Sequence, residues 1–584
     1  MPMQRSRVVG LAGLLLLATG VLTRFALTLP LLKYALKRVS ESRLGLASRL
    51  ERPQYTRGLL ACAQKLSLRS GWPMRELWSK LPFVIENHVY VFNVTNPAEV
   101  ERGAKPIVRE VGPFVYDTFQ EKVDQADNEK DDTLSYVLEN TYFYNRRKSN
   151  GLSDELEVFF PHLFILGVAG GPLREQPSQA SFTSRAIDAI LGAPRNLFYK
   201  LPVRTLLFDG LPIPCAGVDD YFGRLICNEI RDKYAHFLEH RGEVYYASLF
   251  GFRNGSSPAQ RRVRIARGSR RLADLGRIVE VDGAANLSTW RDDRCDAFAG
   301  TDGTIFPPLM SRRRNKRLAL VYPAICRRLS LVYEAQVEID GLKLLRYTGD
   351  LGTDGQHTPE DRCYCAAPRD CLRRGVFELY KCLRVPIVLS NPHFYLADPY
   401  YLTAVDGLHP DKELHQTRVD LDPLTGSPVR AHVRAQFNMQ LMPVDKFRLM
   451  RNYSYAMLPL VWTDEIVALP DLFVLKIKIG YLLLRLVALF QYAAMAAGSV
   501  LCLLAAFASY AARRRRRAAA ADDDTAAGPG ERAATAANAA PAGPDERPAT
   551  AATAAAGVVD DHGKYNIARL LSAIRPAAMP PTVD

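Results

Sequence analysis

The 584-residue sequence predicts an α+β protein: a β-rich body with a helical insertion, placed between two hydrophobic runs. Short β-type runs separated by turn signals recur from residue 83 to about residue 460. Residues 155–240 relax toward a helical pattern, and apolar runs occupy residues 8–32 and 486–512. A hydrophobic content of 48% allows a sizeable core in the middle of the chain.

The run at residues 486–512 is the clearer membrane span. It contains no charged residue, and at 1.5 Å per residue it gives ~40 Å of helix, which crosses a ~30 Å hydrocarbon core with tilt. Residues 513–517 are five arginines, as is typical of the cytosolic side of a span. We therefore predict a membrane helix here.

The run at residues 8–32 has two interpretations. Its first part is short for a span and ends near Ala18-Thr-Gly20, which fits a cleaved signal peptide. Residues 25–32 are apolar again and Arg24 can snorkel to the outer interface, which favours an uncleaved anchor. The favoured topology has a cytosolic tail (1–7), a first span (8–32), an extracellular or luminal domain (33–480), a second span (486–512) and a cytosolic tail (513–584).

The glycosylation sequons agree with this topology. Four lie between the two runs and neither tail contains one, although a single sequon is weak evidence. The four acceptor residues are Asn93, Asn254, Asn286 and Asn452. The predicted location is the plasma membrane with both termini cytosolic, and a lysosomal or endosomal membrane is the alternative.

The formal net charge of +14 is unevenly distributed. Residues 261–271 hold six arginines, and residues 312–317 form a second basic cluster. Nucleic acid is a poor explanation for basic runs on the outer side of a membrane protein. Two interpretations stay open: a solvated face, or a patch that attracts anionic particles, lipids or glycans.

Local patterns assign elements along the chain. Helices are expected within residues 33–82, 186–191 and 225–238, and strands at 84–85, 89–92, 107–111, 114–116, 276–281, 331–337, 385–389 and 433–441. The Ala-, Pro-, Gly- and Asp-rich tail from residue 518 is predicted to be largely disordered.

One segment of the tail differs in pattern. It begins with Lys564, ends with Arg575, and spaces four apolar residues at i, i+3, i+4 and i+7. That spacing fits docking in the groove of a cytosolic adaptor, and accidental spacing is the equal alternative. Leu570-Leu571 suggests a dileucine sorting signal, but the usual upstream acid is missing because Asn566 occupies its place.

Cysteine usage indicates an oxidising compartment. Six of the ten cysteines lie between residues 295 and 382, and Cys363-Tyr-Cys365 is the closest pair. The spacing lacks the paired C-x-x-C units of a zinc site, so disulfides are favoured. Six cysteines allow fifteen pairings, and spacing does not choose among them.

Ordered motifs between residues 83 and 440 resemble the class B scavenger receptor family, which includes fatty-acid translocases, lysosomal integral membrane glycoproteins and sensory neuron membrane proteins. The motifs are Asn96-Pro97, Gly103-Ala-Lys-Pro106, Glu110-Val-Gly-Pro-Phe-Val-Tyr116, Leu275-Gly-Arg-Ile278, Asp282-Gly283, Trp290, Gly300-Thr-Asp-Gly303, Phe306-Pro-Pro308, Ser390-Asn-Pro-His-Phe-Tyr395, Asp406-Gly-Leu-His-Pro410, His415 and Gln436-Phe-Asn438. The resemblance implies a large antiparallel β-barrel ectodomain with a helical apex, anchored by two transmembrane helices.

The same resemblance implies cysteine pairings. Carried over by position, it pairs Cys295 with Cys363, Cys326 with Cys382, and Cys365 with Cys371, and each bridge typically contributes ~2–4 kcal/mol. Cys215 and Cys227 lie outside this set and fit a local fourth bridge. Cys62 is left without an account, and Cys502 lies near the cytosolic end of the second span, where acylation is plausible.

The implied function is lipid handling. A hydrophobic tunnel through the ectodomain would pass fatty acid, sterol or lipoprotein lipid to the membrane, because each sequestered methylene contributes ~0.8 kcal/mol. At the apex, Gly192-Ala-Pro194 interrupts the helix on which relatives present lysines, so Arg195 and Lys200 are only weak ligand-binding predictions. Two alternatives remain: a lysosomal or endosomal sorting receptor for a luminal protein bound at the apex, and an adhesion or recognition receptor without lipid transfer.

Enzymatic activity has no support in the sequence. No G-x-S-x-G elbow, H-E-x-x-H helix or phosphate-binding glycine loop is present, and no cofactor is expected. His393, His409 and His415 lie in the family motifs. A metal site at His409 and His415 is conceivable, but satisfied turn or core histidines are the better interpretation.

Overall fold

The computed structural model describes residues 66–171, 173, 176–257, 260–311, 315–350, 362–365 and 371–526. The chain divides into two units, residues 8–503 and residues 1–7 together with 504–584. The predictions for residues 8–32, for Cys62 and for the segment from Lys564 to Arg575 lie outside the described residues.

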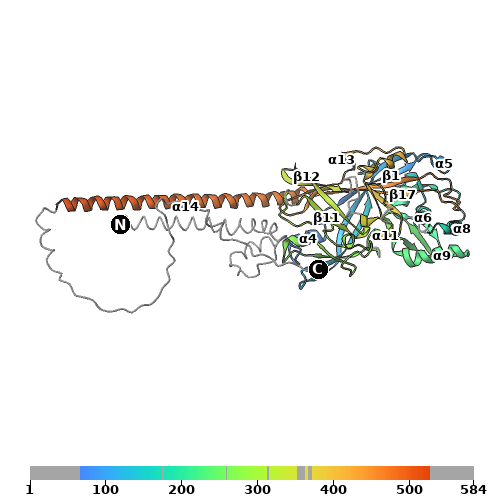
Figure 1. Ribbon diagram of the computed structural model, residues 1–584, viewed down its shortest axis with the longest axis horizontal. Coiled ribbons are helices and arrows are strands. Elements are labelled where there is room, and N and C mark those ends of the chain that lie inside the picture. The colour runs from blue at the N-terminus through green and yellow to red at the C-terminus, as the bar shows by residue number, and fades with distance from the viewer. Residues whose placement is uncertain are drawn as a thin grey trace, which may run out of the picture. The chain divides into compact units, whose positions relative to one another are not determined.

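One sheet of thirteen strands dominates the larger unit (Figure 1), in the order β10-β9-β3-β2-β1-β18-β17-β16-β13-β12-β11, with β15 pairing β17 and β14 pairing β15. All these pairs are antiparallel. The strands are β1 (Ile85–Val94), β2 (Val108–Asn128), β3 (Thr133–Tyr144), β9 (Arg262–Ala266), β10 (Ile278–Val281), β11 (Arg317–Tyr322), β12 (Arg327–Ile339), β13 (Leu342–Asp350), β14 (Val376–Glu378), β15 (Ile387–Ser390), β16 (Arg418–Leu421), β17 (Pro428–Leu441) and β18 (Ala456–Ala468).

The two edges of this sheet meet through one residue. Thr301 forms a bridge to Arg277, beside β10, and a second bridge to Leu320 in β11. Gly300 permits this approach, since a Cβ at that position would lie 2.5 Å from the carbonyl oxygen of Ala319. The sheet is therefore a nearly closed barrel, and the Gly300-Thr-Asp-Gly303 motif lies at its seam.

Helices and two small sheets cap one end of the barrel (Figure 1). The helices are α6 (Leu163–Gly170), α8 (Ala180–Leu191) and α9 (Tyr221–Glu229), and the small sheets pair β4 (Glu157–Pro161) with β5 (Phe198–Pro202) and β6 (Leu211–Pro214) with β8 (Val244–Ala247) and β7 (Glu239–Arg241). Helix α8 ends at Gly192, whose left-handed conformation (φ 70°) forms the C-cap. The predicted interruption of this helix thus has a capping glycine as its cause.

The remaining helices are short except for one. They are α4 (Pro73–Ser79), α5 (Pro97–Val100), α10 (Asp293–Asp296), α11 (Tyr380–Leu383), α12 (Tyr400–Thr403), α13 (Lys412–His415) and α14 (Asp471–Ala526). Helix α14 starts after Pro470 and continues through the five arginines, so its helical structure extends beyond the predicted span and into the start of the predicted disordered tail. Judged by length and hydropathy together, no helix within the described residues qualifies as a membrane span.

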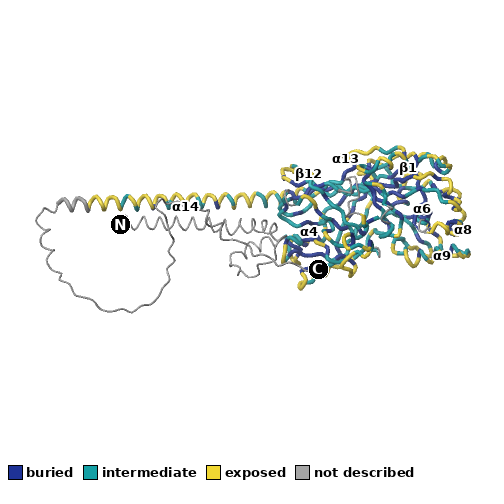
Figure 2. The backbone as a smooth tube through the Cα atoms, in the orientation of Figure 1, coloured by how far each residue is buried: buried dark blue, intermediate teal, exposed yellow. Residues whose placement is uncertain are grey.

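The strands carry the core, which Figure 2 shows as dark tube within the barrel and the cap. The largest buried cluster joins β1, β2, β17 and β18 to α6 and α8, and includes Phe92, Phe114, Phe160 and Leu460. The predicted strand runs all overlap observed strands. The helical prediction for residues 33–82 holds in the described part only for α4, because Gly71 (φ 76°) and the backbone bond from Leu68 to Arg267 interrupt it.

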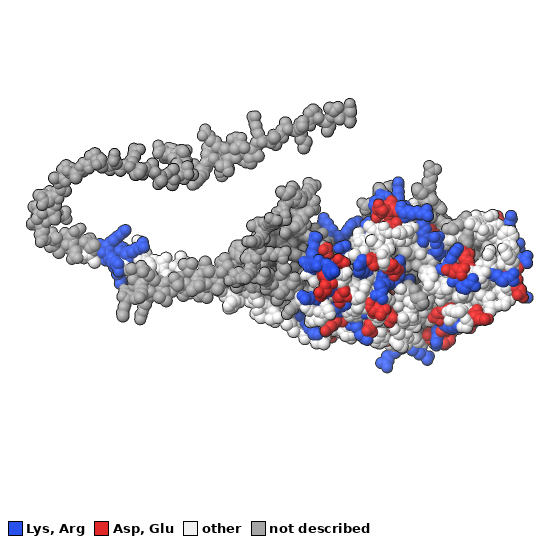
Figure 3. Space-filling view, turned by 90° about the horizontal axis from the view of Figure 1, so that it is seen from below, with Lys and Arg blue, Asp and Glu red and all other residues white. Residues whose placement is uncertain are grey.

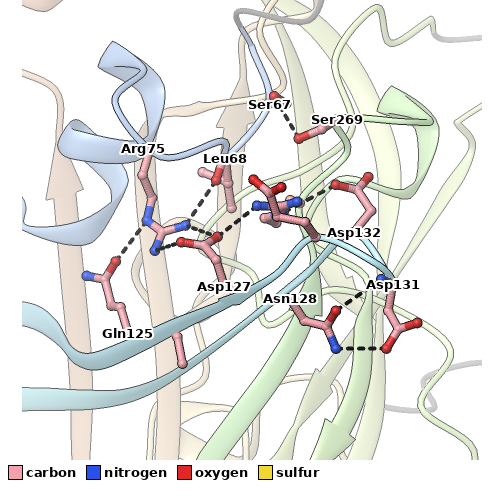
Figure 4. A network of polar contacts seen from close by, with 12 residues as sticks. Ser67, Leu68, Arg75, Gln125, Asp127, Asn128, Asp131, Asp132 and Ser269 are labelled. Carbon is pink, nitrogen blue, oxygen red and sulfur yellow. Dashed lines mark hydrogen bonds and ion pairs between the residues drawn. The ribbon is translucent and has the colours of Figure 1, made fainter.

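A polar network attaches α4 to the barrel (Figure 4). Arg75 donates to the Leu68 carbonyl (3.0 Å) and forms an ion pair with Asp127 (3.4 Å). Arg267 pairs with the same Asp127 (3.1 Å) and with Asp132 (3.2 Å). Both guanidinium groups are buried and both have carboxylate partners, so the chain itself balances this charge.

Candidate functional site: a cavity inside the barrel

The barrel and its helical cap enclose a cavity of about 800 Å³. Its lining includes residues of α8 and α9 at one end and Pro428 and Leu469, just before α14, at the other. This volume lies in the range of small-molecule sites, ~300–1,000 Å³. One continuous space therefore joins the cap to the start of α14.

Strand alternation makes the cavity wall apolar. On β17, the lining includes Ala431, Val433, Ala435, Phe437 and Met439, which are alternate residues and so share one face of the strand. The neighbouring β18 contributes alternate residues in the same way, and β12 and β15 add leucines. The period-two pattern of these strands thus produces an apolar passage along the barrel.

At the cap, apolar side chains at the cavity reach solvent. Phe182 of α8 and Leu225 of α9 line the cavity and are 51% and 55% exposed. Phe182 stacks on Phe222 with ring centroids 4.7 Å apart, and Arg185 lies over Phe222. An exposed apolar cluster at the end of an apolar cavity has the character of an entrance.

Several polar groups interrupt the apolar wall. Burial lowers the pKa of Lys122 to about 8, partly offset by Asp302, and Lys122 donates to the Trp78 carbonyl (2.9 Å). Burial raises the pKa of Glu465, and Asp464 adds to the rise. Burial also raises the pKa of Tyr142 to about 12, with Glu465 adding to the rise and Arg253 opposing it.

The two predicted apex cations lie outside the cavity lining. Lys200 is on β5 and forms an ion pair with Glu157 (2.8 Å), and its side chain is 57% exposed. Arg195 is exposed in the loop after α8. Both positions fit ordinary surface charges, and the described wall of the cavity contains neither of them.

The structure contains the four disulfides that were expected. Cys295–Cys363, Cys326–Cys382 and Cys365–Cys371 connect segments around β11 to β14, and Cys215–Cys227 joins the cap loop to α9. Cys502, on α14, is free and partly exposed, and its acylation stays a prediction.

The sequons differ in accessibility. Asn254, Asn286 and Asn452 are exposed. Asn93 lies within β1, is half-buried, and its Oδ1 accepts a hydrogen bond from the Phe159 backbone (2.7 Å). The first three are therefore more accessible than Asn93, and glycosylation of all four stays a prediction.

The arginine cluster at residues 261–271 is balanced by nearby acceptors. Arg261 pairs with Asp282 (2.6 Å), Arg262 with Asp124 (3.3 Å), and Arg264 with Glu280. The other three contact Asp127 and Asp132, the Glu129 carbonyl, or Asp274. Figure 3 shows basic and acidic residues interspersed on the face it presents. These pairs favour the solvated-face interpretation over an anion-attracting patch.

The family-motif histidines are held by hydrogen bonds. His393 Nε2 lies 2.6 Å from Glu110, and its Nδ1 accepts from the His409 backbone (3.0 Å). His415 stacks on His393 and its Nδ1 accepts from the Asp411 backbone (2.8 Å). In the described part of the chain no group of three or more potential ligands is placed to hold a metal ion.

Sequence reasoning missed the polar residues of the cavity wall. Asn87, Tyr142, Arg253 and Glu465 do not belong to the recognised motifs, and each is a common residue in an unremarkable stretch. Alternation gives little signal for Glu465, because it shares the lining face of β18 with the polar Thr463 as well as with Val467. No local pattern marks Arg253, since its position depends on tertiary structure.

Comparison with known proteins agrees with this architecture. The chain is 37% identical over 454 residues to sensory neuron membrane protein 1 of Apis mellifera. The aligned region covers 76% of this chain and 86% of the relative. It is 35% identical over 428 residues to that of Plutella xylostella (73% and 80% covered) and 34% over 417 residues to that of Ostrinia furnacalis (71% and 78%). The names of these relatives denote membrane proteins and no enzyme. A sequence model of the CD36 family matches residues 60–509, and the chain belongs to this family.

Proposed function

We propose that this protein is a membrane-attached receptor that binds lipophilic molecules and passes them through the barrel toward the membrane. The observation that carries the proposal is the continuous apolar cavity, which runs from the exposed Phe182 and Leu225 to Leu469 beside α14. A lipid in such a passage keeps its methylenes out of water, which contributes ~0.8 kcal/mol for each one. No catalytic group is required for this transfer.

A substitution that fills the cavity tests lipid passage. Ala435 faces the cavity from the middle of β17, so Ala435→Trp should obstruct it. Ala98, exposed in α5 and absent from the lining, provides the matched control Ala98→Trp. We expect the full-length Ala435→Trp protein in vesicles to accept labelled fatty acid or sterol at least about tenfold more slowly than wild type, with Ala98→Trp unchanged.

Equal uptake by both variants would contradict passage through the barrel. Ligand capture that survives Ala435→Trp while transfer is lost would support the passage and identify the cap as the capture site. Capture and transfer that are absent from the wild-type protein across several lipid classes would favour the adhesion or recognition alternative.

Membrane attachment is part of the proposal. Helix α14 has large exposed apolar side chains, among them Leu489 (63%), Phe490 (75%) and Leu503 (70%), and such surface calls for an apolar environment. We propose anchoring by residues 8–32 and 486–512 at the plasma membrane, with both termini cytosolic. Alkaline extraction should leave the full-length protein in the membrane pellet, and terminal tags should resist protease in sealed cells. Release by alkali would contradict the anchor.

A further inference from the structure

Arg253 is held at the cavity wall by backbone contacts around it. It ends a short 3₁₀ turn, Gly251–Arg253, that follows β8. Next to it, Gly255 donates to the Asn140 carbonyl (2.8 Å), and Asn254 Oδ1 accepts from the Tyr142 backbone (3.1 Å). These bonds fix Arg253 beside β3, and both Arg253 and Tyr142 line the cavity.

The guanidinium of Arg253 has no counter-ion in the described part of the chain. Its Nε is buried and has no hydrogen-bond partner, and among the described residues its side chain forms neither an ion pair nor a hydrogen bond. Its guanidinium carbon lies 5.2 Å from the centroid of the Phe252 ring. A charge that is partly removed from water and lacks an anion is unfavourable, so an anion supplied from outside is stabilised there.

The other buried cations of the wall are satisfied. Lys122 donates to the Trp78 carbonyl (2.9 Å), and Arg434 pairs with Asp464 (3.0 Å). Arg384 is exposed. Of the cations that line the described wall, Arg253 is thus the one whose buried charge the chain leaves unbalanced.

A second donor without a partner lies on the same segment. Ser248 also lines the cavity, and its Oγ is buried without a hydrogen bond. Around these donors the wall is aromatic and aliphatic: Phe250 contacts Phe437 with ring centroids 6.0 Å apart, and Leu389 lies in the same lining. A single positive charge within an apolar passage suits a single negative charge at the end of an apolar chain.

We propose that Arg253 and Ser248 form an anion subsite within the cavity, which binds the carboxylate of a long-chain amphiphile while its chain lies along the apolar wall. This inference rests on the proposed function, since it places a polar binding group within the proposed lipid passage. The same lining contains the carboxyl groups of Glu229, Asp302 and Glu465. Burial raises the pKa of Glu465, which reduces its repulsion of a carboxylate.

Matched ligands and variants test the subsite. Binding of palmitic acid, palmityl alcohol and methyl palmitate is measured on the full-length protein in nanodiscs. Wild type should bind the acid more tightly than the two neutral analogues. Arg253→Met should weaken acid binding by about 10- to 100-fold, the loss of one charge-assisted hydrogen bond, and change binding of the neutral analogues by less than about twofold.

The controls separate the charge from its position. Arg146 is exposed and absent from the cavity lining, so Arg146→Met should behave as wild type. Arg253→Lys keeps the charge but not the planar geometry and should retain part of the preference for the acid. Thermal unfolding of each variant verifies that the fold is retained.

The outcomes distinguish the subsite from the passage itself. If the acid and both neutral analogues bind wild type equally, and Arg253→Met changes none of them, the subsite is overturned and the proposed function stands. If none of the three binds wild type, both are overturned. A loss of acid binding that Arg146→Met reproduces would also overturn the subsite.

Discussion

Two sets of buried charges in this barrel differ in how they are balanced. In the network beneath α4, Arg75 and Arg267 contact Asp127 and Asp132, and every charge has a partner from the chain. In the cavity wall, Arg253 has no such partner within the residues that the structure describes. Groups of the same chemical type therefore serve two purposes. The paired charges stabilise the fold. The unpaired charge lowers the free energy of unfolding, and a bound anionic ligand can raise it again.

The largest expected effect comes from breaking the paired set. Arg267 is 5% exposed, and Arg267→Met would leave the buried Asp132 without its ion-pair partner and would leave Asp127 with Arg75 alone. We expect the free energy of unfolding to fall by about 3–5 kcal/mol, measured by denaturant titration of the full-length protein. Arg271→Met, which removes an exposed pair with Asp274, should cost less than about 1 kcal/mol. If Arg267→Met and Arg271→Met lower the free energy of unfolding by similar amounts, the buried ion pairs do not have the structural role assigned to them.

The next effect is on pH dependence and concerns two buried histidines. Burial lowers the pKa of both His162 and His415 to about 4. The unfolded chain binds a proton at each near pH 6.5 whereas the folded chain does not, so stability is complete above that pH and falls as the pH decreases toward 4. Each histidine should cost about 2 kcal/mol at pH 5 relative to pH 7.

His162→Phe isolates one of these contributions. Its Nδ1 is buried without a partner and its ring contacts Phe164 and Tyr199, so phenylalanine suits the site. The variant should lose about half of the two-histidine decrease in stability between pH 7 and pH 5, as seen in unfolding curves at several pH values. An unchanged pH slope would show that His162 is protonated freely in the folded protein.

A smaller effect, of opposite sign to that at Arg267, is expected in the cavity. Arg253→Met removes a buried charge that lacks a partner, so the ligand-free protein should be as stable as wild type or more stable by about 1 kcal/mol. Delipidated full-length protein is required for this measurement by thermal unfolding. Destabilisation comparable to that of Arg267→Met would place Arg253 with the structural charges.

The smallest effect is expected at the apex. Lys200→Met breaks the exposed pair with Glu157 and should change the free energy of unfolding by less than about 1 kcal/mol. Lipid uptake should be unchanged, because Lys200 is outside the cavity lining. A large loss of lipid uptake would instead support the original prediction that Lys200 binds ligand at the apex.

The fold could be predicted from the sequence further than the site. Period-two runs mark long strands such as β1, β12 and β17, and the family motifs imply the barrel and the cysteine pairs. The continuity of β2 through Gly112-Pro113 was not foreseen, since proline usually ends a central strand. Nor was the partnering of the arginines at residues 261–271, because their carboxylates come from distant strands.

The cavity wall shows why site residues are harder to predict. Asn87 on β1 and Glu465 on β18 are opposite each other in the sheet although 378 positions separate them in sequence. Their shared environment arises only when the barrel closes. A sequence pattern predicts the face of the strand on which each residue lies. It does not predict which side chains will or will not lie within hydrogen-bond distance after folding.

The seam at Thr301 has a mechanical consequence. Val321 donates to the Thr301 carbonyl (2.8 Å) and Thr301 to that of Ala319 (3.2 Å), whereas β17 and β18 pair along twelve positions. Fewer hydrogen bonds therefore join the two edges at this seam than join β17 to β18, and we expect the seam to open first if a ligand widens the barrel. A ligand with a bulky ring system would then have to widen the barrel at this seam more than a ligand with a slender chain would.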